Sequence, residues 1–270
     1  MTKTVEQSPG MGEMLKPAEL IELRGTGPLT LQDRRVFNLL IENAWGPRIA
    51  DPGRVFTIET TALKNEDESN ARLVETVERL MRTIVKARDA DGKETRLQLL
   101  STNTLKTTAN RGTFEYCFPP RLAELLKDST IFAKLDLEGM RSFSSKYAFA
   151  LYEAVSRRVR LRHVFTEELS IEALRDLLGV EAGKLAPFKN LLRKAIEPAV
   201  VEVNAISPYS VTILPKKDGR KVVGFIMGWG MKDTDGMKEA YSELHRPRIG
   251  RKERITGMAE SVVTSSRVDS

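Results

Sequence analysis

The chain has 270 residues, enough for two domains of ordinary size, and its 41% apolar and 30% charged residues are typical of a globular protein. No apolar run approaches the roughly 20 residues needed to cross a bilayer, and the first residues lack the apolar core of a signal peptide. The single cysteine, Cys117, excludes an internal disulfide and favours the reducing cytoplasm, and His163 and His245 are too few and too far apart for a metal site. We therefore expect no metal, no cofactor and no membrane association.

The net charge of +6 is unevenly distributed, because the excess of Lys and Arg over Asp and Glu lies mainly in residues 136–231. A basic domain favours an anionic partner, with nucleic acid ahead of a membrane, although solubility alone would also explain the charge. Residues 1–17 and 232–270 lack sustained apolar periodicity and predict flexible tails. The second tail carries a basic cluster at 246–254 (RPRIGRKER), which either touches DNA phosphates or is solvated.

Residues 18–135 predict a first domain of three helices and a hairpin. Thr30 and Asp33 resemble a capping box before a helix over 31–45, a short helix is expected near 58–64, and 69–85 carries a third apolar stripe. Strands at 96–102 and 112–118 would form the hairpin. The third helix mixes basic and acidic residues, as a solvated face does, so we assign only a weak DNA contact to its cations and to those near the hairpin tip: Arg72, Arg79, Arg82, Lys106 and Arg111.

Residues 136–231 repeat this order more clearly. Ser144 and Ser145 predict the start of a helix over 146–160, and Ser170 predicts the start of another over 171–178, with Gly179 as its left-handed C-terminal cap. The stretch GVEAGKL, residues 179–185, resembles a phosphate-binding loop, but it has one residue too few between the glycines and no Ser or Thr after the lysine. We interpret it as the turn into a third helix.

This third helix is expected to begin near Pro187 and to bend or end at Pro198. Its apolar stripe runs from Phe188 to Val203, and cations at i,i+4 spacing without any acid lie on the other face. Such a face suits the major groove, where Arg and Lys bond guanine and Asn bonds adenine; a solvated helix face is the alternative. The candidate recognition residues are Lys184, Lys189, Asn190, Arg193 and Lys194.

A hairpin with an Asp218-Gly219 turn follows, and three helices plus a hairpin make a winged helix. Cations near the hairpin tip and at the end of the 146–160 helix are assigned to phosphates, although helix-dipole effects also explain the second group. These residues are Lys216, Lys217, Arg220 and Lys221 on the hairpin, and Arg157, Arg158, Arg160 and Arg162 near the helix end.

The runs SSKYAFALYEAVSRR, LSIEALRDLLGV and FKNLLRKAIEPAVVEVN, followed by a hairpin containing DGRKV, resemble the replication initiators of iteron-containing bacterial plasmids. The likeness is specific over 144–229 and weaker over 29–135. It implies an α+β fold of two winged-helix domains related by duplication. It also implies that the third helix of the second domain enters the major groove of repeated origin DNA, with Lys189, Asn190, Arg193 and Lys194 on the recognition face.

The resemblance further implies that the first domain binds the adjacent groove or mediates dimerisation. Dimers would repress the protein's own promoter, and monomers would open the origin and recruit the host initiator and the replicative helicase. No Ser, His and carboxylate combination suggests an enzyme, and Tyr147 and Tyr152 lack the metal site that DNA nicking requires. The rival interpretations are a winged-helix transcriptional regulator without a replication role, a DNA-cleaving enzyme, and an assembly protein whose basic helix faces an acidic partner.

Overall fold

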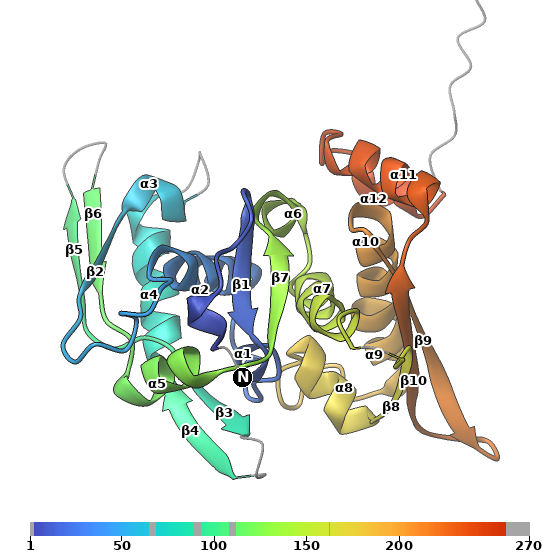
Figure 1. Cartoon of the computed structure of the whole chain (residues 1–270). Helices are drawn as coiled ribbons and strands as arrows, with labels where there is room; N and C mark the ends of the chain where they lie inside the picture. The colour runs from blue at the N-terminus through green and yellow to red at the C-terminus, as the bar shows by residue number, and fades with distance from the viewer. Residues whose placement is uncertain (1–2, 65–68, 89–92, 108–111, 162, 258–270) are drawn as a thin grey trace, which may run out of the picture.

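The computed structural model describes residues 3–64, 69–88, 93–107, 112–161 and 163–257. Two halves lie side by side, and β1, β7, α1, α2 and α7 lie between the outer elements of each (Figure 1). The elements of the first half are η1 (Thr4–Glu6), β1 (Glu13–Pro17), α1 (Ala18–Ile21), α2 (Leu31–Asn43), β2 (Phe56–Glu59), α3 (Thr60–Leu63), α4 (Asn70–Arg82), β3 (Ile84–Arg88), β4 (Glu94–Gln98), β5 (Asn103–Thr107), β6 (Gly112–Tyr116), α5 (Pro120–Asp128) and β7 (Phe132–Asp136).

The three helices predicted for the first half are present. Thr30 and Asp33 form a complete capping box, in which each side chain accepts the backbone N–H of the other, and Ser69 caps α4. The predicted hairpin is wrong in its pairing: β4 pairs with β3, and the partner of β6 is β5, with β2 on its other side. Leu99 and Leu100 are both fully buried, so strand alternation stops there and the chain forms two hairpins.

The second half contains the helices that the sequence predicts. Ser145 and Ser170 cap their helices, and Gly179 has the left-handed conformation, with φ of 66°. The sequence did not predict β8, a short edge strand that makes a sheet of order β8-β10-β9. The elements are α6 (Leu137–Ser142), α7 (Lys146–Arg158), β8 (Thr166–Ser170), α8 (Ile171–Leu178), α9 (Phe188–Leu191), the π-helical turn η2 (Leu192–Ile196), α10 (Glu197–Ile206), β9 (Tyr209–Asp218), β10 (Lys221–Met231), α11 (Thr234–Leu244) and α12 (Arg251–Ile255).

The two stretches predicted as flexible tails contain folded elements within their described residues, 3–17 and 232–257. β1 pairs antiparallel with β7, and its Met14 and Leu15 are buried. At the other end, α11 and α12 pack against α10, and Arg251 is buried at 5% exposure while it donates to several backbone carbonyls. Neither stretch has a sustained apolar periodicity of its own, so the fold of these elements depends on contacts with the rest of the chain.

A single hydrophobic core runs through both halves, from Leu40 in α2 to Leu151 in α7 and Val203 in α10. The junction between the halves also holds buried charge. The ammonium of Lys16 lies 2.7 Å from a carboxylate oxygen of Glu153, and the side-chain amide of Asn38 donates to that oxygen at 2.7 Å. In the described part of the chain, no helix is long and apolar enough to cross a membrane.

Candidate nucleic-acid interface

The recognition helix is one continuous helix made of α9, η2 and α10. Its apolar stripe is buried against the core, with Leu191 and Ile196 at 1% exposure and Ala195, Ala199 and Val203 fully buried. The opposite face is exposed to solvent. It carries the predicted cations Lys189, Arg193 and Lys194, while Asn190 is half-buried beside them.

These exposed cations have no acidic partner, in contrast to Arg79, Arg82 and Lys106 of the first half. Across the described ranges, none of the ion pairs involves Lys184, Lys189, Arg193 or Lys194. An exposed guanidinium or ammonium without an ion pair can bind an anion without first breaking a contact to an acid of the protein. The helix therefore presents its charge outward, as phosphate and base recognition requires.

The turn before this helix is held by a residue that sequence reasoning did not single out. The guanidinium of Arg175 on α8 donates to the carbonyl of Leu185 at 3.1 Å and to that of Lys184 at 2.5 Å. Leu185 itself has a left-handed φ of 50°, a conformation that costs free energy in a leucine and needs such external support. GVEAGKL is thus a clamped helix-turn-helix connection, and no local pattern in the sequence marks Arg175 as the clamp.

Pro198 does not end the recognition helix. The chain accommodates it with the π-helical turn η2, in which the N–H of Glu197 bonds the carbonyl of Leu192, five residues earlier. The helix then continues to Ile206. A proline inside a helix removes one N–H and crowds the carbonyl four residues before it, and a wider turn relieves both problems. The rings of Phe188 and Phe225, 5.9 Å apart, fix the start of the helix to the hairpin.

The β9–β10 hairpin is the wing, and its two-residue loop is Gly219-Arg220 rather than Asp218-Gly219, because Asp218 pairs with Lys221. Only Gly219 has a positive φ, 56°, which fits a turn that needs glycine at its first central position. Within the described chain, Lys217, Arg220 and Lys221 are exposed and form no ion pair. Lys216 differs, since its ammonium lies 2.5 Å from a carboxylate oxygen of Glu168 on β8.

Arg157 and Arg158, which the sequence assigns to DNA phosphates, are engaged in ion pairs within the protein. The side chain of Arg158 is only 4% exposed and lies between Glu167, at 2.7 Å, and Glu22, at 3.4 Å. Arg157 is 19% exposed and pairs with Glu22 at 2.5 Å. Both arginines therefore join α7 to acids outside it. Arg160 lies over the ring of Phe132, with 4.6 Å between its guanidinium carbon and the ring centre, and Arg162 falls outside the described residues.

In the first half, the candidate DNA contacts are mostly neutralised. Arg79 makes a two-point contact with the fully buried carboxylate of Asp33, at 2.8 and 3.0 Å. Arg82 pairs with Glu78 and Lys106 with Glu115. Arg72 is exposed and forms no ion pair within the described ranges, whereas Arg111 lies outside them. α4 thus differs from the recognition helix of the second half, which has no such pairing.

The two tryptophans and Tyr152 are held by packing or hydrogen bonds within the protein. Trp229 is 6% exposed and Trp45 donates its indole N–H to the carbonyl of Gln7 at 3.1 Å. Burial raises the pKa of the Tyr152 hydroxyl well above its ordinary value, which opposes formation of a nucleophilic phenolate, and the hydroxyl accepts the N–H of Asp136. The described residues contain no group of His, Cys, Asp and Glu arranged to hold a metal ion.

Two family models match this chain in tandem. The model described as "Initiator Replication protein, WH1" matches residues 13–156, and the one described as "Initiator Rep protein, WH2" matches residues 170–229. The chain belongs to the initiator replication protein family. The α+β fold of two winged-helix domains is thereby confirmed. The boundary between residues 135 and 136 stays a prediction.

A solved structure supports the same fold. The Pi initiator protein, determined in complex with iteron DNA, is 18% identical with a TM-score of 0.59, and the match covers 82% of this chain and 98% of that one. At this identity the likeness concerns the fold alone. No curated protein matches the sequence.

Proposed function

We propose that this protein is a plasmid replication initiator that binds repeated origin DNA sequence-specifically through the recognition helix of its second half. The observation that carries the proposal is the unpaired basic face of the α9–η2–α10 helix beside an equally unpaired wing tip. A helix of this kind fits the major groove, and a basic hairpin beside it reaches the sugar-phosphate backbone. Membership of the initiator family and the iteron complex of a protein with the same fold support the proposal.

The cations of the recognition helix and those of the wing would make different kinds of contact with DNA. Arg193 and Lys189 would bond guanine O6 and N7, and Asn190 would bond adenine N6 and N7. Lys217, Arg220 and Lys221 would hold phosphates, which fixes the position of the protein without selecting a sequence. Lys184, in the turn before the helix, and Lys194, on the helix, would add further contacts to DNA. Lys216 would have to release Glu168 before it could contribute.

The first half would have a different role. With Arg79, Arg82 and Lys106 paired to acids, we assign it mainly to dimerisation, with a weaker contact to the adjacent groove through Arg72. Dimers would repress the protein's own promoter, and monomers would open the origin and recruit the host initiator and replicative helicase. The action is non-enzymatic: contacts from two domains offset the free-energy cost of deforming the duplex.

The proposal is tested by titrating DNA that flanks the gene with the unaltered protein, Arg193→Ala and Lys217→Ala, at several salt concentrations. Arg193→Ala should weaken specific binding by about 1–3 kcal/mol and relax the sequence preference. Lys217→Ala should weaken binding to all sequences alike and lower the salt slope by about one. If neither substitution changes the binding, the face is solvent-facing and the interpretation as an assembly protein with an acidic partner gains support.

A transcriptional regulator of the same fold would give identical titrations. Plasmid maintenance separates the two functions. Deletion of the gene should abolish maintenance of an origin-bearing plasmid, whereas unchanged copy number would favour the regulator.

A further inference from the structure

A loop of the first half, residues 24–29 between α1 and α2, lies against the turn 179–185 that precedes the recognition helix, and we call this contact the seam. The two backbones meet there. A Cβ atom at position 27 would lie 2.5 Å from the Cα atom of Glu181 and 2.9 Å from its nitrogen, which is closer than side chains approach a backbone. Gly27 is buried, and only glycine fits at this position without displacing the turn.

Gly179, the C-terminal cap of α8, makes a second close contact across the seam. A Cβ atom at position 179 would overlap a guanidinium nitrogen of Arg34 on α2 and lie 3.0 Å from Oγ1 of Thr26. That nitrogen donates to Oγ1 of Thr26 at 2.8 Å, and both side chains are buried. A glycine from each half therefore lets the loop and the turn pack directly against each other.

The loop is held firmly on the first-half side of the seam. The backbone N–H of Arg24 donates to the carbonyl of Lys86 on β3 at 3.0 Å, and the N–H of Lys86 donates back at 2.9 Å. The ammonium of Lys146, the first residue of α7, donates to the carbonyls of Gly27 at 2.7 Å and Leu29 at 3.3 Å. A cation at the start of a helix opposes the helix dipole, and these two hydrogen bonds offset that cost.

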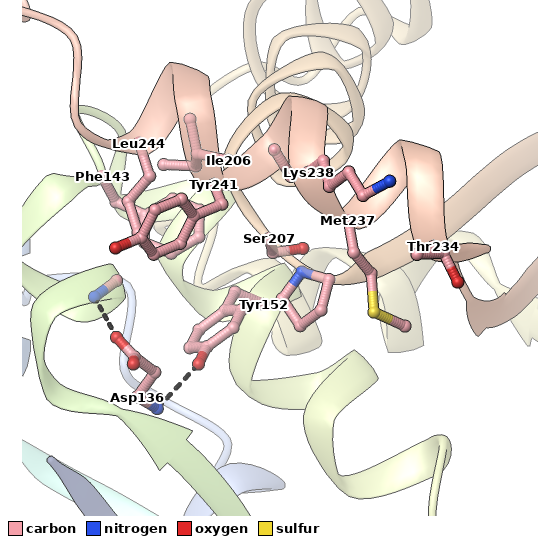
Figure 2. Close-up of a pocket in the computed structure, with 13 residues that line it drawn as sticks. Asp136, Phe143, Tyr152, Ile206, Ser207, Thr234, Met237, Lys238, Tyr241 and Leu244 are labelled. Atoms are coloured by element: carbon pink, nitrogen blue, oxygen red, sulfur yellow. Dashed lines mark hydrogen bonds between the residues drawn. The ribbon is translucent and has the colours of Figure 1, made fainter.

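Helix α7, which carries Lys146, is fixed to the first half in its turn. The hydroxyl of Tyr152 accepts the backbone N–H of Asp136, at the end of β7, at 2.9 Å (Figure 2). One turn of chain along α7, the carboxylate of Glu153 forms the buried pair with Lys16 on β1. The loop 24–29 and the lysine that holds it therefore belong to one well-packed body.

The turn on the other side of the seam has fewer constraints. Residues 181–184 are all exposed, and the clamp from Arg175 holds carbonyls only at the end of the turn. The N–H of Lys184 donates to the carbonyl of Glu181 at 3.0 Å, so a shift of Glu181 is passed on toward the recognition helix. Segments with few buried contacts move more easily than the packed elements beside them, so a displacement at the seam moves the turn.

We infer that Gly27 is a positioning residue for DNA reading: the loop 24–29 holds the turn where Lys184, Lys189 and Asn190 face the DNA. The inference rests on the proposed function of the recognition helix. Gly27 acts through the backbone of Glu181, and it lies outside residues 170–229, which the second family model matches. Ordinary contacts begin near 3.4 Å, so Gly27→Ala would displace Glu181 by about 0.9 Å. Contacts to a ligand need their side chains placed to within about 0.5 Å, so base reading should suffer.

The test is an anisotropy titration of the full-length chain with two duplexes, namely the gene-flanking DNA that the unaltered protein binds most tightly and a scrambled duplex of equal length and composition. Gly27→Ala should lower the ratio of the two affinities about tenfold and leave the salt slope unchanged, because the wing still holds the phosphates. The matched control is Gly230→Ala on β10, where a Cβ atom meets nothing within 4 Å. This control should change neither quantity.

A second variant covers the case in which Gly27→Ala does not fold, which circular dichroism at the titration temperature shows. Lys146→Met removes the support of the loop and leaves Gly27 in place, and it should lower the ratio about threefold or more. The salt slope should stay the same, whereas a fall of about one would mean that this ammonium binds a phosphate and would overturn its supporting role.

The outcomes separate the inference from the proposed function. If the unaltered protein does not distinguish the two duplexes, the proposed function fails and the positioning role fails with it. If it does distinguish them but Gly27→Ala and Lys146→Met behave like Gly230→Ala, only the positioning role is overturned. Equal weakening for both duplexes would overturn it as well, because the seam would then support the fold without affecting sequence preference.

Discussion

The partner of each arginine, rather than the arginine itself, decides its role in this protein. Arg79, Arg158 and Arg193 all lie on helices and all suit DNA contact by sequence, but of the three only Arg193 forms no ion pair in the described structure. Arg79→Ala would leave the buried carboxylate of Asp33 with only its capping contacts. We expect it to lower the free energy of unfolding by about 2–4 kcal/mol, measured by urea denaturation with circular dichroism.

The control for that measurement lies one turn along the same helix. Arg82 and Glu78 are 78% and 49% exposed, so Arg82→Ala should cost about 1 kcal/mol or less. Neither substitution should change the salt slope of DNA binding. A drop in DNA affinity for Arg79→Ala without loss of stability would contradict the structural role assigned to this residue.

At the scale of elements, the π-helical turn η2 sets the angular position of Lys189 and Asn190 relative to α10. Pro198→Ala restores an N–H and allows a regular α-helix. Loss of the one extra residue in the π-helical turn would rotate the start of the helix by about 100° relative to α10. We expect the variant to gain about 1–3 kcal/mol in stability, since proline is unfavourable inside a helix, and to lose about tenfold in specific DNA affinity. Denaturation and DNA titration measure the two effects.

The control variant is Pro120→Ala, which removes a proline from the first turn of α5, where the missing N–H has no helical partner. This variant should change neither property appreciably. If the Pro198→Ala variant kept the DNA sequence preference of the unaltered protein, packing of the buried apolar stripe, and not the proline, would be what holds the π-helical turn.

At the scale of the whole molecule, the shared core and the Lys16–Glu153–Asn38 contacts should make both halves unfold together. The chain contains two tryptophans, Trp45 in the first half and Trp229 in the second, so Trp45→Phe and Trp229→Phe each leave one reporter. Urea transitions from the two variants should have the same shape and differ only by the stability cost of each substitution. A first transition confined to one tryptophan would show that the halves unfold separately.

The junction itself is tested by Lys16→Met, which removes the ammonium paired with the buried Glu153 carboxylate and leaves Asn38 and the nearby Arg34 as its partners. The expected cost is about 3–5 kcal/mol, seen by both tryptophans. Adding Glu153→Gln, which removes the buried charge, should restore part of this stability. Lys3→Met, which breaks the exposed pair with Asp128, should cost about 1 kcal/mol or less and serves as the control.

Local signals in the sequence identified three helices in each half, their caps and the wing, but not α1, α5, α6, α11 or α12. Thr30, Ser69, Ser145, Ser170 and Gly179 act within a few residues of themselves, and a period of 3.6 identifies a buried stripe whatever it packs against. The same local information placed Lys189, Arg193 and Lys194 on one face of the third helix. The family resemblance over 144–229 then supplied the tandem winged-helix fold.

Tertiary structure alone decided which cations are unpaired and which stretches are folded. Glu22 lies more than 130 residues before Arg157 and Arg158 in the chain, and Asp33 lies 46 residues before Arg79, so no local pattern connects them. The order of β1, α11 and α12 likewise comes from distant partners, since β1 pairs with β7 and α11 is attached through Asn204, Pro208 and Ser142. Ion pairs and strand pairing form between residues that are close in space but distant in the sequence, whereas caps and helical stripes form between near neighbours.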